Sequence, residues 1–153
     1  MTNFSAITFA QRLVGRSALA CFLILGLVSI ARPGQSSDRE HPAELAGDLV
    51  TGKIAADDKG EQFYSFIAGP GEVKLKASLA ADSGRFGITI GLQPESGPSF
   101  LSLKLEHLKS KNEEASGHVV LQTRQRLVLR IAGTQSGGSG VYKIRLGGAV
   151  SFK

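Results

Sequence analysis

The chain has one cysteine, no tryptophan and only 7 % aromatic residues among its 153 residues. A single cysteine, Cys21, excludes a disulfide framework and a thiolate zinc site. The hydrophobic fraction of 42 % and the modest formal net charge of +5 exclude a disordered chain, which combines low hydrophobicity with high net charge. The length corresponds to about one domain.

The N-terminal residues have the pattern of a secretory signal peptide. Residues 1–16 carry two arginines and no acidic residue, and residues 17–31 carry no charge. As a helix this uncharged run is about 22 Å long, which is short for a hydrocarbon core of about 30 Å. Ser29 and Ala31 match the small-x-small pattern of a cleavage site. We therefore expect a signal helix over residues 1–31 and export to the periplasm or the extracellular space, with an uncleaved anchor as the alternative.

Two segments follow the signal peptide. Residues 32–46 are polar and contain Pro33 and Pro42 without apolar periodicity, so we expect a flexible lead-in. Residues 47–153 change to short apolar runs and are expected to form one β domain. Without residues 1–31, the chain has no cysteine and its net charge falls by two.

Alternation of apolar and polar residues predicts strands in this domain, because successive strand side chains point to opposite faces. The expected inward positions are Val73, Leu75, Ala77 and Leu79; Phe86, Ile88, Ile90 and Leu92; Leu101, Leu103 and Leu105; Leu127, Leu129 and Ile131; and Tyr142, Ile144 and Leu146. Less regular strands are expected near 49–55, 62–68 and 118–123. The one helical candidate, 105–115, has too few apolar residues to pack well. About eight short strands separated by Gly- and Pro-containing turns predict an all-β antiparallel sandwich.

Five segments carry a resemblance to a known family: GDLVTGKI, EQFYSFIAGPGEVKLKASL, FLSLKLEH, RLVLRIAG and GVYKIRLGG. Tyr64 and Phe66 form an aromatic-x-Phe pair, Gly69 and Gly71 stand at a turn, and Tyr142 lies in the closing strand. Over residues 46–148 this pattern resembles the bacterial pre-peptidase C-terminal domain. The resemblance implies a jelly-roll-like sandwich of eight strands that serves as an accessory module of exported peptidases. It implies a fold and a compartment, and no activity.

Catalytic and metal-binding motifs are scarce. The sequence has no G-x-S-x-G elbow, and Ser136 and Ser139 lie in a Gly-rich stretch expected to be a hairpin loop. The three histidines, His41, His107 and His118, have no metal-ligand spacing. His107 and His118 flank one loop and are expected to be polar strand-end residues. We therefore expect no catalytic site, no cofactor and no metal.

Calcium and sugar binding are also disfavoured by the sequence. Asp57, Asp58 and Glu61 lie close together near Gly60, but their spacing is not that of a calcium loop, so we expect a turn. A sugar platform needs exposed aromatic planes. Parity assigns Tyr64, Phe66, Phe86 and Tyr142 to the core, which leaves Phe63, Phe100 and Phe152 as the exposed candidates. For Phe63 and Phe100, packing under a loop is an equal alternative.

Positive charge is concentrated in the C-terminal third of the chain. Residues 100–153 carry nine basic and three acidic side chains, whereas residues 32–99 carry more acidic than basic ones. Five basic residues have outward parity in expected strands: Lys104, Arg126, Arg130, Lys143 and Arg145. We interpret them as a candidate face for an anionic partner, with a merely solvated surface as the alternative.

These observations favour an exported, non-enzymatic β-sandwich that acts as a binding or accessory protein. The expected partner is a protein or an anionic envelope polymer. Nucleic acid is not expected for an exported protein, and membrane contact is expected only through the signal segment. The alternative is a structural or assembly subunit that pairs through an open edge strand.

Overall fold

A computed structural model describes residues 34–54, 60–84, 86–107, 113–134 and 138–153 of the chain. The expected signal segment lies outside the described residues, so its cleavage and the export of the protein stay predictions. The described part contains strands and no helix. Accordingly, it includes no helical segment suited to crossing a membrane.

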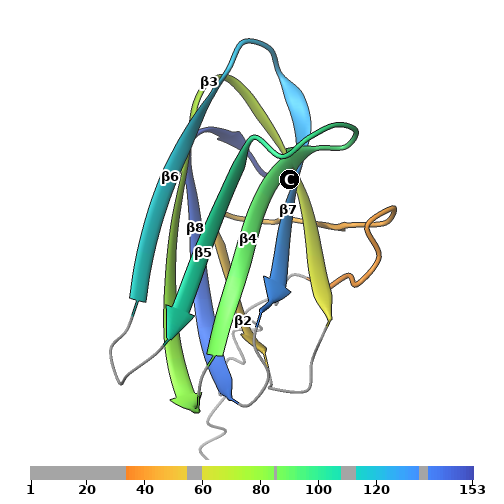
Figure 1. Cartoon of the computed structure of the whole chain (residues 1–153). Coiled ribbons are helices and arrows are strands. Elements are labelled where there is room, and N and C mark those ends of the chain that lie inside the picture. Colours follow the sequence, from red (N-terminus) through yellow and green to blue (C-terminus); the bar gives the residue numbers. More distant parts are fainter. Residues whose placement is uncertain (1–33, 55–59, 85, 108–112, 135–137) are drawn as a thin grey trace, which may run out of the picture. The chain divides into compact units, whose positions relative to one another are not determined.

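Eight strands make up the described fold (Figure 1). They are β1 (Ala43–Glu44), β2 (Leu49–Ile54), β3 (Glu61–Ser83), β4 (Phe86–Pro94), β5 (Leu101–His107), β6 (Glu113–Leu121), β7 (Gln125–Gly133) and β8 (Ser139–Ser151). In β3, β4, β7 and β8 every inward position expected from the alternation is at most 4 % exposed. In β5, Leu105 is buried, whereas Leu101 and Leu103 are partly buried. The all-β fold class is therefore confirmed, and in those four strands the period-two pattern matches the buried face.

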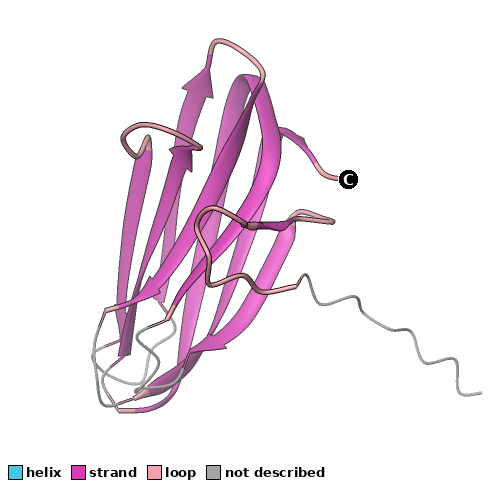
Figure 2. Ribbon diagram, turned by 90° about the vertical axis from the view of Figure 1, so that its right-hand side faces the viewer, coloured by secondary structure: helices cyan, strands magenta, loops and turns pink. Residues whose placement is uncertain are grey.

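Hydrogen bonding links the strands in the order β2-β8-β3-β7-β4-β5, with β6 and β1 also paired to β3. On one side, β3 pairs with β7 over residues 61–68 and with β6 over residues 71–79. This change of neighbour folds the network into two layers, β2-β8-β3-β6 and β3-β7-β4-β5 (Figure 2). The two layers bury one shared core.

The layers meet where β3 bends. Gly69 and Gly71 have φ angles of 79° and 122°, which glycine adopts at little steric cost. Gly69 and Gly71 predict a turn here that separates two strands. Instead, β3 continues through this point, and its pairing with β8 only shifts register between Ala68 and Val73.

The other side of the sandwich is closed by side chains between β5 and β6. A Cβ on Gly117 would lie 2.8 Å from Leu101, so the absence of a side chain at residue 117 lets the β5 leucines pack against β6. The Glu106 amide donates to Glu113 Oε2 at 2.8 Å across the same gap. β6 begins at Glu113, whereas the sequence predicted a strand only from residue 118. The first residues of β6 are mostly polar and show little apolar alternation, so the pattern did not reveal them.

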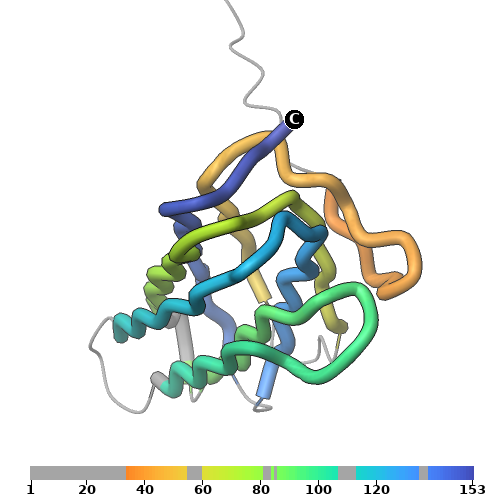
Figure 3. Tube along the Cα trace, turned by 90° about the horizontal axis from the view of Figure 1, so that it is seen from above, coloured from red at the N-terminus to blue at the C-terminus, as the bar shows by residue number. Residues whose placement is uncertain are grey.

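Part of the segment expected to be a flexible lead-in is attached to the sandwich. Ala43 and Glu44 pair in parallel with β3, and the Leu45 amide donates to the Ser65 carbonyl oxygen at 2.9 Å. The Phe63 amide donates to the Ser36 carbonyl oxygen at 2.8 Å. Figure 3 shows this orange segment alongside the yellow first part of β3. It covers an edge of β3 that would otherwise be open.

Candidate functional site

The structure does not bring the five outward basic residues of the sequence analysis together. Lys104 lies on β5, and Arg126 and Arg130 lie on β7, all in the β3-β7-β4-β5 layer. Lys143 and Arg145 lie on β8, in the β2-β8-β3-β6 layer. The expected face is therefore divided between the two layers of the sandwich.

Arg130 is held by a carboxylate on the neighbouring strand. Its Nε donates to Glu61 Oε2 at 3.0 Å, and its Nη2 donates to Glu61 Oε1. This paired hydrogen bond holds the pKa of Glu61 below its ordinary value and raises the pKa of Arg130. Two parallel hydrogen bonds to one carboxylate give strong geometric fixation. Arg130 is therefore engaged within the fold.

Arg126 also has partners within the fold, and they come from three different segments. Its Nη2 donates to Ser65 Oγ at 2.9 Å, and Ser65 is only 1 % exposed. Its Nη1 lies 3.3 Å from Glu95 Oε1, and its Nη2 lies 3.8 Å from Glu44 Oε1. On β5, Lys104 forms an ion pair with Glu106. We call Lys104, Arg126 and Arg130 the ion-paired face, because each of them contacts a carboxylate.

The opposite layer arranges its basic residues in register across three strands. Arg145 on β8 lies directly opposite Lys76 on β3, and Lys143 lies opposite Ser78. In the next row, Lys74 has Gly147 on one side and His118 of β6 on the other. Lys74 and Lys76 alternate with the inward residues of 73–79, so the sequence predicts that they point outward. It does not predict that they lie beside β8.

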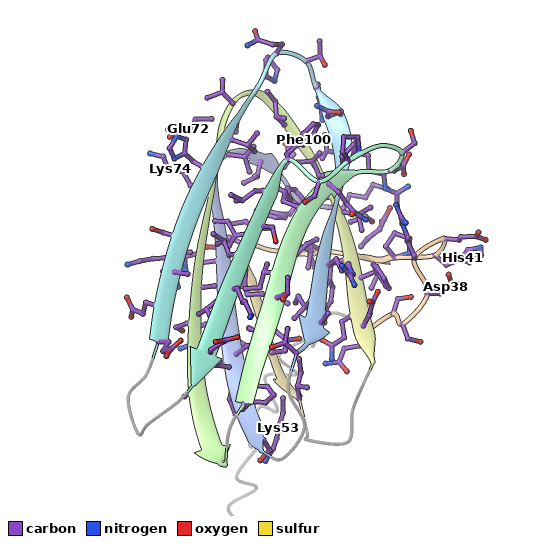
Figure 4. The ribbon with its side chains drawn as sticks, in the orientation of Figure 1. Asp38, His41, Lys53, Glu72, Lys74 and Phe100 are labelled. Carbon is purple, nitrogen blue, oxygen red and sulfur yellow. The ribbon has the colours of Figure 1, made fainter. Side chains whose placement is uncertain are left out.

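These rows line an open trough along β3. Its larger part has a volume of about 380 Å³ and continues into a second hollow of about 290 Å³, with Lys76 and Arg145 shared by both. The polar lining residues are Glu72, Lys74, Lys76, Ser78, Glu114, Ser116, His118, Lys143 and Arg145. Along β3 the trough spans residues 72–78, or about 20 Å at the rise of a strand. In Figure 4 the side chains of Glu72 and Lys74 project outward from this layer.

Charge in the trough is only partly compensated. Lys74 Nζ lies 3.2 Å from Glu72 Oε2, and Arg145 Nε lies 3.6 Å from Asp48 Oδ2. Within the described residues, no carboxylate lies within ion-pair distance of Lys76 or Lys143. Like charges directly opposite each other in a sheet are destabilising. Asp48 compensates only Arg145 of the Lys76–Arg145 pair, so part of the repulsion remains at the centre of the trough.

A hollow lies over Gly147 beside Lys74. A Cβ built on Gly147 would meet no atom within 4 Å, and its φ is outside the left-handed region. The next residue differs, because Gly148 has φ +81° and a Cβ there would collide with the Glu72 carbonyl oxygen. Gly148 is therefore required by the backbone, whereas Gly147 leaves space open in the trough.

Two buried tyrosines have perturbed pKa values but belong to the core. Tyr64 and Tyr142 are fully buried, and burial raises the pKa of both phenols. The Tyr142 hydroxyl donates to Gln62 Oε1, and the lack of a side chain at Gly52 makes room for the Tyr142 ring. Groups with perturbed pKa values often mark functional sites. Here, however, both tyrosine hydroxyls donate to the same acceptor, Gln62 Oε1, inside the sandwich.

The aromatic candidates do not form a platform. Phe63, for which exposure and packing under a loop were both open, is only 4 % exposed, and the segment around Ser36 pairs with it. Phe152 is partly buried and lies 6.2 Å, ring centre to ring centre, from Phe66. Phe100 is 42 % exposed and stands apart in the β4–β5 loop (Figure 4). A single exposed ring gives little area for stacking on a sugar.

Some of the remaining candidate metal and catalytic residues lie outside the described residues. Asp57, Asp58 and Ser136 lie there, while Glu61 is bound to Arg130. His41 Nδ1 lies 2.7 Å from Asp38 Oδ2 on the exposed N-terminal segment (Figure 4). No group of three or more metal-ligating side chains occurs in the described residues.

Comparison with known proteins gives no family for the chain. No protein-family model and no curated protein match it. Among solved structures it is similar to a CBM4 structure, with a TM-score of 0.48 and 10 % identity over 66 % of this chain and 71 % of that chain. It is also similar to a family two carbohydrate esterase from Cellvibrio japonicus, with a TM-score of 0.35 and 14 % identity over 68 % of this chain.

The chain spans 36 % of that esterase. Likeness at this level assigns neither ligand nor activity. The chain is a β-sandwich. Membership in the pre-peptidase C-terminal family stays a prediction.

Proposed function

We propose that this protein is a non-catalytic binding module that holds an anionic partner in the trough. One observation carries the proposal: Lys76 and Arg145 face each other at its centre, and Lys76 and Lys143 have no carboxylate partner in the described part of the chain. A bound anion would relieve the repulsion between the opposed cations. The trough therefore offers an external negative charge two cations that no described carboxylate occupies.

The rest of the molecule supports this choice of surface. On the ion-paired face, Glu44, Glu61, Glu95 and Glu106 already occupy the basic side chains. An external anion would have to displace one of these carboxylates. In the trough, by contrast, Lys76 and Lys143 are available without such a displacement.

The proposal excludes catalysis by the residues of the trough. Ser116 and His118 lie on one face of β6, but no hydrogen bond joins these two described side chains. A serine nucleophile needs a base within hydrogen-bond reach. The proposal also includes export, supported by the signal pattern of residues 1–31, and an accessory role of the pre-peptidase C-terminal type, supported by the sequence resemblance.

A second candidate is assembly through strand addition at β2. In the described part of the chain, β2 pairs with β8 and with no other strand. Its outer edge also carries Leu49, and Val141 stands on the neighbouring strand; both are exposed apolar residues. An added strand would use the backbone groups of this edge, so its binding would be insensitive to the charges of the trough.

Retention on an immobilised polyanion tests the proposal. Lys76→Gln/Arg145→Gln should elute at clearly lower salt than the unchanged protein. Arg39→Gln/Arg124→Gln is the matched control, because it removes the same charge from exposed positions outside the trough. Its elution should shift less. Equal shifts would mean that only net charge matters, and the proposal would fail.

A further inference from the structure

The cations of the trough form a ladder with a regular spacing. Lys74 stands in one row, Lys76 and Arg145 share the next, and Lys143 stands in the third. Consecutive rows are two residues apart along the strands, or about 6.7 Å. A ligand that pairs with all three rows must therefore carry negative groups at the same interval along a line parallel to β3.

One carboxylate limits the length of this ladder. Glu72 stands one row beyond Lys74, whereas Glu114 lies inside the row of Lys143, on the far side of Ser78. A long polymer with uniform negative charge would run over Glu72. A short acidic stretch aligned with the cations ends before Glu72, and Ser78 separates it from Glu114.

An extended peptide has the required geometry. Its alternate side chains point to one side and are about 6.7 Å apart. None of the residues that line the trough is Phe, Tyr or Trp, so the trough offers no large aromatic plane for stacking on a sugar ring. The open space over Gly147 admits a side chain that reaches toward Lys74.

We infer that the trough binds an extended acidic segment of a protein partner, with carboxylates at three alternate positions. This inference rests on the proposed function, because both use the same cations. It adds the class of the partner and the spacing of its charges. The three carboxylates would lie over the rows of Lys74, of Lys76 and Arg145, and of Lys143. Those over Lys76 and Lys143 meet cations without a carboxylate partner, whereas Lys74 would be shared with Glu72 and Arg145 with Asp48.

Two capped seven-residue peptides of glutamate and threonine test the spacing by isothermal titration with the full-length protein. One has glutamate at positions 1, 3 and 5, and its isomer has glutamate at positions 1, 4 and 7. In an extended chain, only the first places all three carboxylates over the ladder. Since each exposed ion pair contributes modestly, losing two of them should weaken binding by about tenfold.

Two glycine variants test the position of the peptide. Gly147→Leu fills the hollow and should weaken binding of the alternating peptide. Gly47→Leu is the matched control, because a Cβ there also meets no atom within 4 Å and Gly47 lies outside the trough. Both variants should keep the melting temperature of the unchanged protein.

A linear polyuronate and a long-chain polyphosphate complete the experiment. Stronger binding of the alternating peptide than of its isomer, lost in Gly147→Leu and in Lys76→Gln/Arg145→Gln, supports the inference. Equal binding of both peptides, or binding of a polymer in their place, overturns the inference; if that binding still requires Lys76 and Arg145, the proposed function stands. No binding of any peptide or polymer contradicts both.

Discussion

The two outer faces of the sandwich carry the same kinds of residue in different electrostatic settings. On the ion-paired face, Arg126 and Arg130 contact glutamates from β1, β3 and the β4–β5 loop. In the trough, Lys76 faces Arg145 across a strand pair. Outward parity is the same in both places. The difference shows that the neighbours of a basic residue on a sheet, and not its outward parity, decide how much of its charge is left for a ligand.

Core residues beneath the two faces should contribute equally to stability. Changing them should give the largest effect on the free energy of unfolding. Leu129 lies under the ion-paired face and Leu146 under the trough, and both are almost completely buried. Each change to alanine should lower the free energy of unfolding by about 2–5 kcal/mol. Leu103→Ala should cost less, because Leu103 is only partly buried. Denaturant unfolding measures all three, and a small loss at Leu129 would contradict the assigned register.

Removing one cation from each face should change the free energy of unfolding in opposite directions. Arg130→Gln breaks the bidentate contact with Glu61 and should cost up to about 1 kcal/mol of unfolding free energy. Lys76→Gln removes a like-charge contact with Arg145 and should be neutral or stabilising by a few tenths of a kcal/mol. Urea titrations at low salt measure both values. Equal destabilisation by the two changes would remove the distinction between the faces.

Acid should weaken the ion-paired face selectively. The hydrogen bonds from Arg130 hold the pKa of Glu61 below its ordinary value of 4.5. A lowered folded-state pKa contributes stability above the unfolded value, and this stability is lost as the pH falls through the folded value. Both side chains are more than a third exposed, so solvent screening limits the effect to a few tenths of a kcal/mol.

The measurement compares the unfolding free energy of the unchanged protein with that of Arg130→Gln at pH 6 and pH 3. The difference between them should shrink at pH 3. A difference that stays constant would mean that Glu61 does not titrate with this contact.

The smallest effect is expected on the N-terminal segment. The hydrogen bond to Asp38 raises the pKa of His41 above 6.5, and both groups are fully exposed. A raised pKa gives stability below the unfolded value that is lost as the pH rises through the folded value. NMR titration of His41 should show a lower pKa in Asp38→Asn, with an unchanged melting temperature. An unchanged His41 pKa would mean that the contact is not populated.

Local sequence signals located most of the strands but not every element. The runs at 73–79, 86–92, 127–131 and 142–146 were predicted with the observed face inward, because the alternation of apolar and polar residues is strict there. The start of β6 was missed, because Glu113, Glu114 and Gly117 give an edge strand without apolar alternation. The sequence left open whether Phe63 is exposed or packed under a loop, because its burial depends on pairing with the distant segment around Ser36.

The all-β class, the inward face of the main strands and the outward direction of the basic residues follow from side-chain periodicity along single strands, so they can be predicted from the sequence. Which strands are neighbours is visible only in the folded chain. The bend of β3 placed Lys76 beside Arg145 and brought Arg130 to Glu61. Pairing between strands far apart in the sequence depends on the packing of the whole core, so charge compensation on each face could not be read from spacing alone.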